Sequence, residues 1–277
     1  MAGSLYIVPT PIGNLADITF RAVEVLKSVS VIAAEDTRRT SILLRHYGVN
    51  SSKNRLLSLH EHNQVSRTME LIKKMSAGES VALVSDAGTP LISDPGSYLI
   101  SKAIESDIKI VSLPGPSAIL TALTGSGFLL DEFLFLGFLP KKRGAMIKRF
   151  EQLRDSPLTI IFFDSPNRIK KTLNILLDVL GDRRIVICRE MTKLYEEIIR
   201  GSISELASGL KENLKGEITV VVEGAGEGEI EVDVINDRIL ELIKKGERVS
   251  AIADQLHKEL GVSKKGIYSL ALKLNKK

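Results

Sequence analysis

Short apolar runs alternate with amphipathic segments along the first 113 residues. The apolar runs, rich in β-branched residues and leucine, lie at 5–8, 29–34, 56–59, 81–84 and 108–113. The segments between them, such as ITFRAVEVLKS (18–28) and VSRTMELIKKM (65–75), carry apolar residues at helical spacing. This alternation predicts a mostly parallel sheet with helices on both faces.

A second series of apolar runs begins near residue 130 and is less regular. Its strand candidates are 133–138, 158–163, 184–188, 196–202 and 218–223. The run EEIIRGS (196–202) alternates polar and apolar residues, as an antiparallel or edge strand does. The pattern therefore predicts two α/β domains, residues 1–125 and 126–225, with the boundary near GSGFLLDE.

The remaining residues, 226–277, are predicted to form a linker and a small basic tail. The tract GAGEGEIEVD (224–233) departs from the G-x-G-x-x-G spacing of nucleotide loops, and its glutamates would repel a pyrophosphate. Beyond it, residues 249–277 contain two helical patterns joined at Gly261, with Ser250 and Ser263 as predicted N-caps. This helix-turn-helix-like tail could contact nucleic acid or close over the protein's own cleft.

Composition places the chain among ordinary globular proteins, with 44% hydrophobic and 26% charged residues. No apolar run reaches the roughly 18 residues of a membrane span, and the first residues lack the pattern of a secretion signal. The one cysteine, Cys188, lies in an apolar strand candidate and is predicted to be a buried, inert thiol. These features predict a cytoplasmic protein without a membrane partner.

Basic residues are concentrated although the net charge is only +4. KKRGAMIKR (141–149) carries five basic residues and no acidic one. It is either a solvated helix face or a surface that contacts phosphates.

Three loops rich in proline and glycine follow predicted strands of the first domain. They are PTPIGN (9–14, the first loop), SDAGTPLISDPG (85–96, the second loop) and LPGPSA (113–118, the third loop). Loops at the carboxyl ends of parallel strands meet at one edge of a sheet, where ligands bind. They contain no lysine or arginine, and Asp86 and Asp94 oppose anions, so a phosphate site is disfavoured. A cation with hydroxyl groups, such as S-adenosylmethionine, fits this chemistry without being the only ligand that does.

The chain resembles the tetrapyrrole-methylase family, and within it the branch that methylates ribose in small-subunit ribosomal RNA. The similarity is carried in order by IVPTPIGNLADIT (7–19), AAEDTRRTSILLRHYG (33–48), LHEHN (59–63), VSDAGTPLISDPG (84–96), LPGPSA (113–118), FLPKKRG (138–144), FFDSPNRI (162–169), CREMTKLYEE (188–197) and GEITVVVEG (216–224).

The resemblance implies two α/β domains with S-adenosylmethionine in the cleft between them. Matching positions assign the second loop, the third loop and a strand end of the second domain to the methyl donor, and place one first-loop residue at the cleft border. These positions are Ala87, Gly88, Thr89 and Ile92; Ser117 and Ala118; Phe163; and Pro11.

The resemblance further implies a homodimer that methylates the 2′-hydroxyl of a decoding-region cytidine in 16S ribosomal RNA, within the 30S subunit, rather than DNA. The first loop lacks the glycine- and aspartate-rich pattern of members that act on tetrapyrroles, which favours the RNA substrate. The ribosomal RNA branch is expected to carry E-S-P-H where this chain has Asp164-Ser-Pro-Asn167. Any role of that histidine therefore does not apply to this chain.

A weakly nucleophilic 2′-hydroxyl would benefit from a nearby proton acceptor. Asp36 and His60, which follow two predicted strands, are the first candidates; Asp36 could instead cap the following helix. A metal pair at His60 and His62 is disfavoured, because alternate strand residues face opposite ways, and no metal is predicted. The candidate RNA contacts are Arg38 and Arg39, followed by Lys141, Lys142, Arg143 and Arg168.

Two other functions fit part of this pattern. A methyltransferase for a corrin or porphyrin precursor would share the donor loops, but would have no use for the basic segments. A non-catalytic RNA-binding protein of ribosome assembly would share every motif and lack only methyl transfer.

Overall fold

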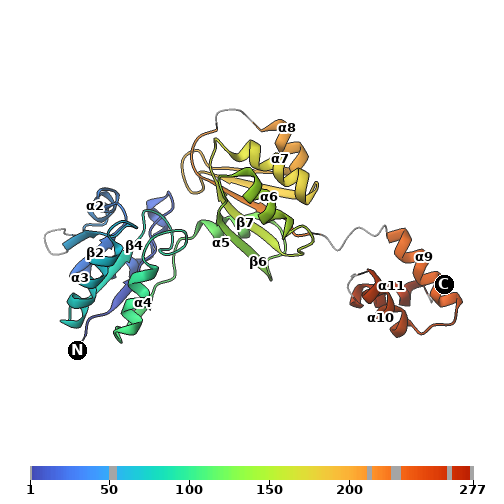
Figure 1. Ribbon diagram of the computed structural model, residues 1–277, viewed down its shortest axis with the longest axis horizontal. Helices are drawn as coiled ribbons and strands as arrows, with labels where there is room; N and C mark the ends of the chain where they lie inside the picture. Colours follow the sequence, from blue (N-terminus) through green and yellow to red (C-terminus); the bar gives the residue numbers. More distant parts are fainter. Residues whose placement is uncertain (1, 50–54, 211–213, 226–231, 261–263, 275–277) are drawn as a thin grey trace.

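The computed structural model describes residues 2–49, 55–210, 214–225, 232–260 and 264–274. Figure 1 shows two sheets covered by helices, followed by a group of C-terminal helices. The two-sheet α/β fold that the sequence predicts is confirmed.

The first sheet is entirely parallel. Its strands are β1 (Leu5–Ile7), β2 (Val31–Ala34), β3 (Arg55–Ser58), β4 (Val81–Val84) and β5 (Ile110–Ser112), in the order β3-β2-β4-β1-β5. The connecting helices are α1 (Phe20–Ser28), α2 (Thr37–His46), α3 (Gln64–Ser76) and α4 (Ser97–Glu105), with a short 3₁₀ turn η1 (Leu15–Asp17). Every residue of β2 and β4 is buried, because helices cover both faces of the sheet.

The second sheet mixes parallel and antiparallel pairs. Its strands are β6 (Phe133–Phe138), β7 (Thr159–Asp164), β8 (Arg184–Arg189), β9 (Glu197–Ser202) and β10 (Ile218–Val222), in the order β6-β7-β10-β8-β9. Its helices are α6 (Arg143–Glu151), α7 (Ile169–Leu180) and α8 (Ile203–Gly209). As the sequence predicts, β9 is an antiparallel edge strand.

Helix α5 (Ala118–Ser126) connects the two sheets. It begins at the third loop, yet its buried Ala122 and Leu123 pack with Ile161, Val186 and Val221 of the second sheet. The domain boundary expected after residue 125 therefore falls in a helix that packs on the second sheet.

Buried side chains on β8 include Cys188, which the sequence predicts to be an inert thiol. It is 1% exposed, and burial raises its pKa to about 11. The thiolate that would make it reactive is therefore scarce at neutral pH.

The C-terminal group consists of α9 (Val232–Lys244), α10 (Val249–Leu260) and α11 (Lys264–Leu274). The sequence pattern predicts the last two and misses α9, part of which it assigns to the linker. The three helices share a core that includes Ile239, Ile252, Leu256 and Ile267. Ser250 lies inside α10, which begins at Val249, so its prediction as an N-cap is wrong; Gly261 and Ser263 lie outside the described residues.

Within the described ranges, no helix has the length and apolar character needed to cross a bilayer.

Candidate active site

The three proline- and glycine-rich loops converge at the carboxyl edge of the first sheet. Thr10 of the first loop and Gly88 of the second exchange two backbone hydrogen bonds, each 2.9 Å long. The Thr89 hydroxyl donates to the Pro116 carbonyl of the third loop at 3.0 Å. Backbone and side-chain bonds thus join all three loops into one surface.

Glycine is needed where these loops meet. Gly88 has φ of +77°, and a Cβ placed there would lie 3.4 Å from the Ile12 side chain and 3.8 Å from the Pro116 carbonyl oxygen. Two non-glycine residues of the second loop, Leu91 and Ser93, also adopt positive φ, at 76° and 69°. Left-handed backbone at such residues costs energy and is concentrated at functional sites.

The second sheet faces the second loop through β6. Gly137 of β6 adopts φ of +64°, and a Cβ there would lie 3.4 Å from the Ser93 hydroxyl, so the second loop reaches this strand. Next to it, the Phe163 ring is 5.1 Å from that of Phe135 and 5.3 Å from that of Phe138, which is 66% exposed. Phe163 therefore belongs to an aromatic group beside the position that the second loop approaches.

Most residues predicted to bind the donor lie on these converging segments. Ala87, Gly88, Thr89 and Ile92 lie on the second loop, and Ile92 is exposed. Ser117 caps α5 by accepting from the Leu120 amide, and Ala118 begins that helix. The loops hold carboxylates and carbonyls without a lysine or arginine, which suits a sulfonium cation.

The carboxylates of this edge are held in different ways. Asp86 accepts from the Asp36 amide at 3.0 Å and pairs with Arg39 at 3.3 Å. Asp36 caps α2 through the Arg38 amide at 2.8 Å and also binds the Arg38 guanidinium through both oxygens. The alternative that Asp36 is a helix cap is therefore what the structure shows.

These environments separate the pKa values of three carboxyl groups. Hydrogen bonds from Arg38 lower the pKa of Asp36 to about 2. Burial, followed by repulsion from Glu35, raises the pKa of Asp94 to about 6. Burial and the nearby Asp86 likewise raise the pKa of Glu35. A group that titrates near neutral pH is better suited to accept a proton than one that titrates near pH 2.

His60 follows β3, at the far edge of the first sheet. Its amide donates to the Asn63 side chain at 2.9 Å, and its buried Nδ1 has no hydrogen-bond partner among the described residues. Because β2 separates β3 from β4, His60 starts about 10 Å from the second loop, at roughly 4.8 Å per strand. Glu35 follows β2 and so starts one strand closer to the second loop, and Asp94 belongs to that loop.

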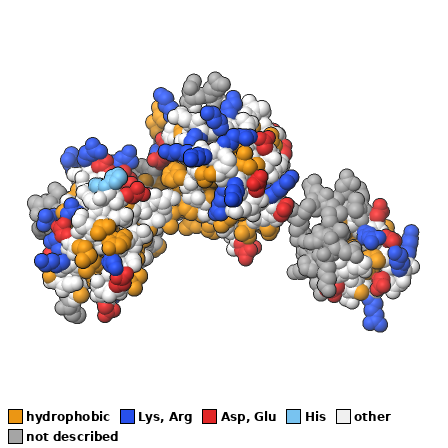
Figure 2. Space-filling view, viewed as in Figure 1, with side chains coloured by type: hydrophobic (Ala, Val, Ile, Leu, Met, Phe, Trp, Pro, Cys, Tyr) orange, Lys and Arg blue, Asp and Glu red, His pale blue; other side chains and the backbone are white. Residues whose placement is uncertain are grey.

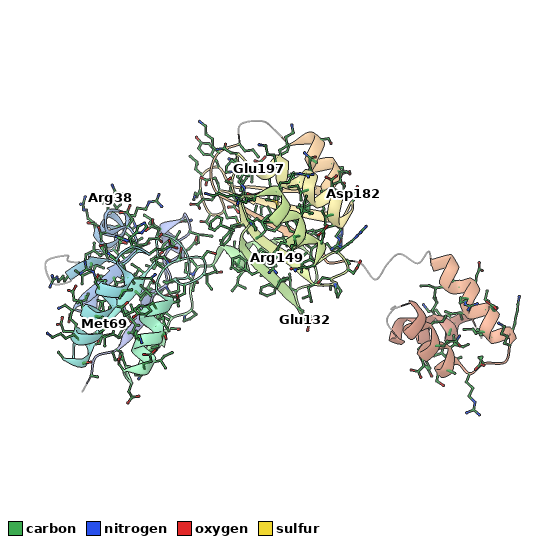
Figure 3. All side chains as sticks on the ribbon, viewed as in Figure 1. Arg38, Met69, Glu132, Arg149, Asp182 and Glu197 are labelled. Carbon is green, nitrogen blue, oxygen red and sulfur yellow. The ribbon has the colours of Figure 1, made fainter. Side chains whose placement is uncertain are left out.

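The predicted RNA contacts divide into exposed and anchored groups. Arg38 and Arg39 are 88% and 67% exposed on α2, and Figure 3 shows Arg38 projecting from that helix. Lys and Arg side chains also gather on this part of the surface in Figure 2. The other exposed group is Lys141, Lys142 and Arg143, at the end of β6.

Arg168 is anchored instead of free. Its guanidinium donates to the Leu139 carbonyl at 3.2 Å and lies 3.3 Å from the carboxylate of Asp164. Asp164 is buried and also accepts from Thr172 and from the Ser165 amide. Arg168 therefore positions the segment that presents Lys141 and Lys142.

A hollow of about 240 Å³ opens beside the first and second loops. The first and second loops form one part of its wall, and η1 and α2 form another. The rest comes from Lys193, between β8 and β9, and Glu217, directly before β10. Its lining is Pro11, Ile12, Gly13, Leu15, Arg39, Thr40, Ile42, Leu43, Ser85, Asp86, Ala87, Lys193 and Glu217. Of the predicted donor residues, only Pro11 and Ala87 border it, which makes it a neighbouring pocket rather than the donor position itself.

Lys193, Glu217 and Asp94 are site residues that the sequence reasoning missed. Lys193 and Glu217 are far from the loops in the sequence. They line the same hollow as Arg39 because of how the two sheets are placed relative to each other. Asp94 was read only as a charge opposed to anions. Its position in a loop with two aspartates and two prolines was the available signal.

Comparison with known proteins shows the family to which the chain is similar. Residues 4–207 match the family described as tetrapyrrole (corrin/porphyrin) methylases. A protein named ribosomal RNA small subunit methyltransferase I from Streptococcus pyogenes serotype M1 is 47% identical over 94% of this chain and 90% of its own length. One of the same name from Escherichia coli O157:H7 is 43% identical over 98% of this chain and 95% of its own.

Two solved structures share the fold at low sequence identity. The methyltransferase CobJ has a TM-score of 0.61 and 18% identity, covering 81% of this chain and 95% of its own. Uroporphyrin-III-C-methyltransferase from Thermus thermophilus has a TM-score of 0.55 and 19% identity, covering 81% and 93%.

Proposed function

The chain belongs to the tetrapyrrole (corrin/porphyrin) methylase family and is a methyltransferase; from this premise, we propose that it methylates ribosomal RNA. The donor is S-adenosylmethionine, and the acceptor is the ribose 2′-hydroxyl of a decoding-region cytidine in the small subunit. The relatives' name supports the RNA substrate, and the resemblance of the motifs supports the particular hydroxyl.

The observation that carries the RNA substrate is the hollow beside the donor loops. Its volume of about 240 Å³ lies below the roughly 300–1,000 Å³ of pockets for drug-sized ligands, so it suits one nucleotide unit better than a tetrapyrrole macrocycle. Its walls combine apolar side chains such as Ile12 and Ile42 with two ion pairs, Arg39 with Asp86 and Lys193 with Glu217. Apolar side chains next to cations suit a base that is joined to phosphates, provided that the phosphates take the place of the carboxylate partners.

The donor fits the adjoining loops. Gly88 leaves open the space that a side chain would fill, and Phe163 and Phe138 offer ring faces to an adenine. Bound there, the sulfonium would supply an activated methyl group. The protein's contribution is alignment, which can lower a barrier by about 7–11 kcal/mol in well-oriented systems.

The proton acceptor is proposed to lie among the residues that follow β2, β3 and β4. Asp36 and His60 remain predictions, to be tested by Asp36→Asn and His60→Gln. Asp94, with a pKa of about 6, has the protonation behaviour that a base needs, and Asp94→Asn completes the set.

The assembly and location of the protein are part of the same proposal. We place it in the cytoplasm as a homodimer that acts on the assembled 30S subunit. Leu129 and Phe133, which are 84% and 40% exposed near the start of β6, offer apolar surface for self-association. The exposed Lys141 and Arg143 offer a surface for RNA phosphates.

The test is transfer of labelled methyl groups to purified small subunits that lack their native modifications, followed by mass mapping of nuclease fragments. Label on a single ribose would establish the reaction and its substrate. Donor binding without label on subunits or naked RNA would favour the other two functions. Label on a tetrapyrrole precursor would then separate the methyltransferase of that class from a non-catalytic assembly protein.

A further inference from the structure

We propose that Lys193 binds a backbone phosphate next to the methylated ribose and exchanges its partner Glu217 for that phosphate when RNA enters the hollow. This inference rests on the proposed RNA substrate. It assigns to Lys193 a contact that complements the one predicted for Arg39.

Lys193 lies opposite the RNA-contacting arginines. It belongs to residues 190–196, the segment between β8 and β9, while Arg39 belongs to α2 of the first sheet, and both line the same hollow. Two cations on walls that come from different sheets can hold a chain of phosphates that passes between them.

The segment that carries Lys193 has a strained backbone. Glu190 and Thr192 adopt φ of +50° and +64°, although neither is glycine. The Glu190 amide donates to the Glu217 carbonyl at 3.0 Å, and the Lys193 amide donates to the Glu190 carbonyl at 3.0 Å. Residues in this backbone region persist only where their surroundings enforce it.

This segment also touches the first loop. The Asn14 amide donates to the Thr192 hydroxyl at 3.0 Å. A Cβ at Gly13 would lie 2.4 Å from Cγ of Lys193, so the loop passes directly over the lysine side chain. Lys193 is thus held at the border between the donor loops and the hollow.

The two carboxylates that bind Lys193 are not equivalent. Glu190 is 2.8 Å from Nζ, its side chain is 19% exposed, and it also accepts from the Glu217 amide at 2.9 Å. Glu217 is 3.0 Å from Nζ with its side chain 69% exposed. Exposed ion pairs contribute little free energy, so a phosphate can replace Glu217 while Glu190 keeps the lysine in place.

The exchange predicts opposite effects on RNA binding for two substitutions that each remove a charge. Lys193→Gln should weaken binding of unmodified small subunits roughly three- to tenfold and make the dependence of log K on log salt shallower by about 0.7–0.9. Glu217→Gln removes a carboxylate that competes with phosphate, so it should strengthen binding at low salt. Both proteins should bind S-adenosylmethionine with wild-type affinity by calorimetry.

Two further variants separate a phosphate contact from a structural role. Lys74 pairs with Glu79 at 3.1 Å and its side chain is 20% exposed. The pair lies at the amino end of β4, whereas the loops follow the carboxyl ends of the strands, so Lys74→Gln should leave RNA binding unchanged. Lys193→Arg should restore most of the affinity that Lys193→Gln loses.

The inference is overturned if Glu217→Gln weakens RNA binding as Lys193→Gln does, or if the salt dependence of Lys193→Gln equals that of the wild type. Should Lys193→Gln fail to fold, Glu217→Gln decides alone, since unchanged or weaker binding contradicts the exchange. Absence of RNA binding by the wild type would instead remove the proposed substrate, and the inference with it.

Discussion

At the scale of single residues, neighbours of the same chemical type have different tasks. Asp36 is committed to capping α2 and to Arg38, whereas Asp94 is half-buried near other carboxylates, an environment that raises its pKa. Sequence proximity to a strand end cannot distinguish these situations, because the difference arises from which partner reaches each carboxylate. The candidate base is therefore chosen by environment and not by motif.

Gly88→Val should abolish donor binding. A β-branched side chain is strained at φ of +77° and would enter the space between the first and third loops. We expect a loss of roughly a hundredfold or more in affinity for S-adenosylmethionine, or about 3 kcal/mol, by calorimetry. Gly127→Val is the matched control. Gly127 has φ of +78°, and its Cβ position has no atom of the described residues within 4 Å apart from its own helix and chain neighbours. Equal affinities in the two variants would remove Gly88 from the donor site.

Asp94→Asn should stabilise the protein at pH 8 and have no effect near pH 4. The folded pKa of about 6 lies above the ordinary value of 3.8, so the stabilising neutral form is complete below pH 4 and is lost as the pH rises through 6. The gain is at most about 3 kcal/mol. Urea unfolding of wild type, Asp94→Asn and the exposed control Asp131→Asn at both pH values measures it. A gain at pH 4 as large as at pH 8 would contradict the raised pKa.

At the scale of elements, strand ends connect the fold to the site. Asp164 ends β7 and binds Thr172 of α7 at 2.5 Å, the Ser165 amide at 2.8 Å and Arg168 at 3.3 Å. Arg168 in turn holds the end of β6 through the Leu139 carbonyl. One buried carboxylate thus fixes a helix, a turn and the basic segment that follows β6.

Asp164→Ala should therefore destabilise the protein by about 3–5 kcal/mol, because it leaves the Arg168 charge and the Thr172 hydroxyl without their partner. Asp178→Ala, at an exposed position of α7 whose carboxylate lies 3.6 Å from Arg143, is the control and should cost far less. Denaturant unfolding monitored by circular dichroism compares them. A similar small loss in both would show that the Asp164 network contributes little.

The elements themselves were largely predictable, whereas their tertiary contacts were not. Residues such as Val31 and Val81 lie in apolar runs, and the length and spacing of these runs predict strands that are buried on both faces. Helix α9 was missed because the acidic, glycine-rich tract before it obscured the apolar spacing of Ile235, Ile239 and Leu242. Lys193 was missed for another reason: its importance comes from a strained turn that meets a loop 178 positions away.

At the scale of the whole molecule, the loops proposed to bind the donor belong to the first sheet, and the aromatic group of Phe135, Phe138 and Phe163 belongs to the second. The proline and glycine pattern indicated the loops, and the family resemblance assigned Phe163 to the same site. The structure adds that the second loop approaches β6 beside the rings of Phe138 and Phe163. The helices α9–α11 carry their own core and none of the residues predicted to bind the donor. Donor binding and the tail should therefore be separable.

A chain that ends at residue 225 should bind S-adenosylmethionine within about twofold of the full-length affinity, an energy difference below about 0.5 kcal/mol. Its main thermal unfolding transition should also be retained, since the tail core around Ile252 is its own. Calorimetry measures both quantities. Ile252→Asp in the full-length chain disrupts that core without shortening the protein. Its affinity for S-adenosylmethionine should equal that of the chain that ends at residue 225. A large loss of donor affinity on truncation would instead support closure of the tail over the cleft.

The first loop makes contact with both binding regions at once. Thr10 pairs with Gly88 at the donor loops, and four residues later Asn14 bonds to Thr192 beside Lys193. Pro11 lies between these two contacts and restricts the backbone of the segment, so we expect a displacement at one end to reach the other. Thermodynamic linkage then requires reciprocity: whatever factor the methyl donor contributes to RNA affinity, RNA must contribute to the affinity for the donor. Methyl transfer converts the donor, at the Thr10 end of this segment, into a product without the methyl group. If the two ligands are coupled, this change in the donor also sets the rate at which the methylated RNA dissociates.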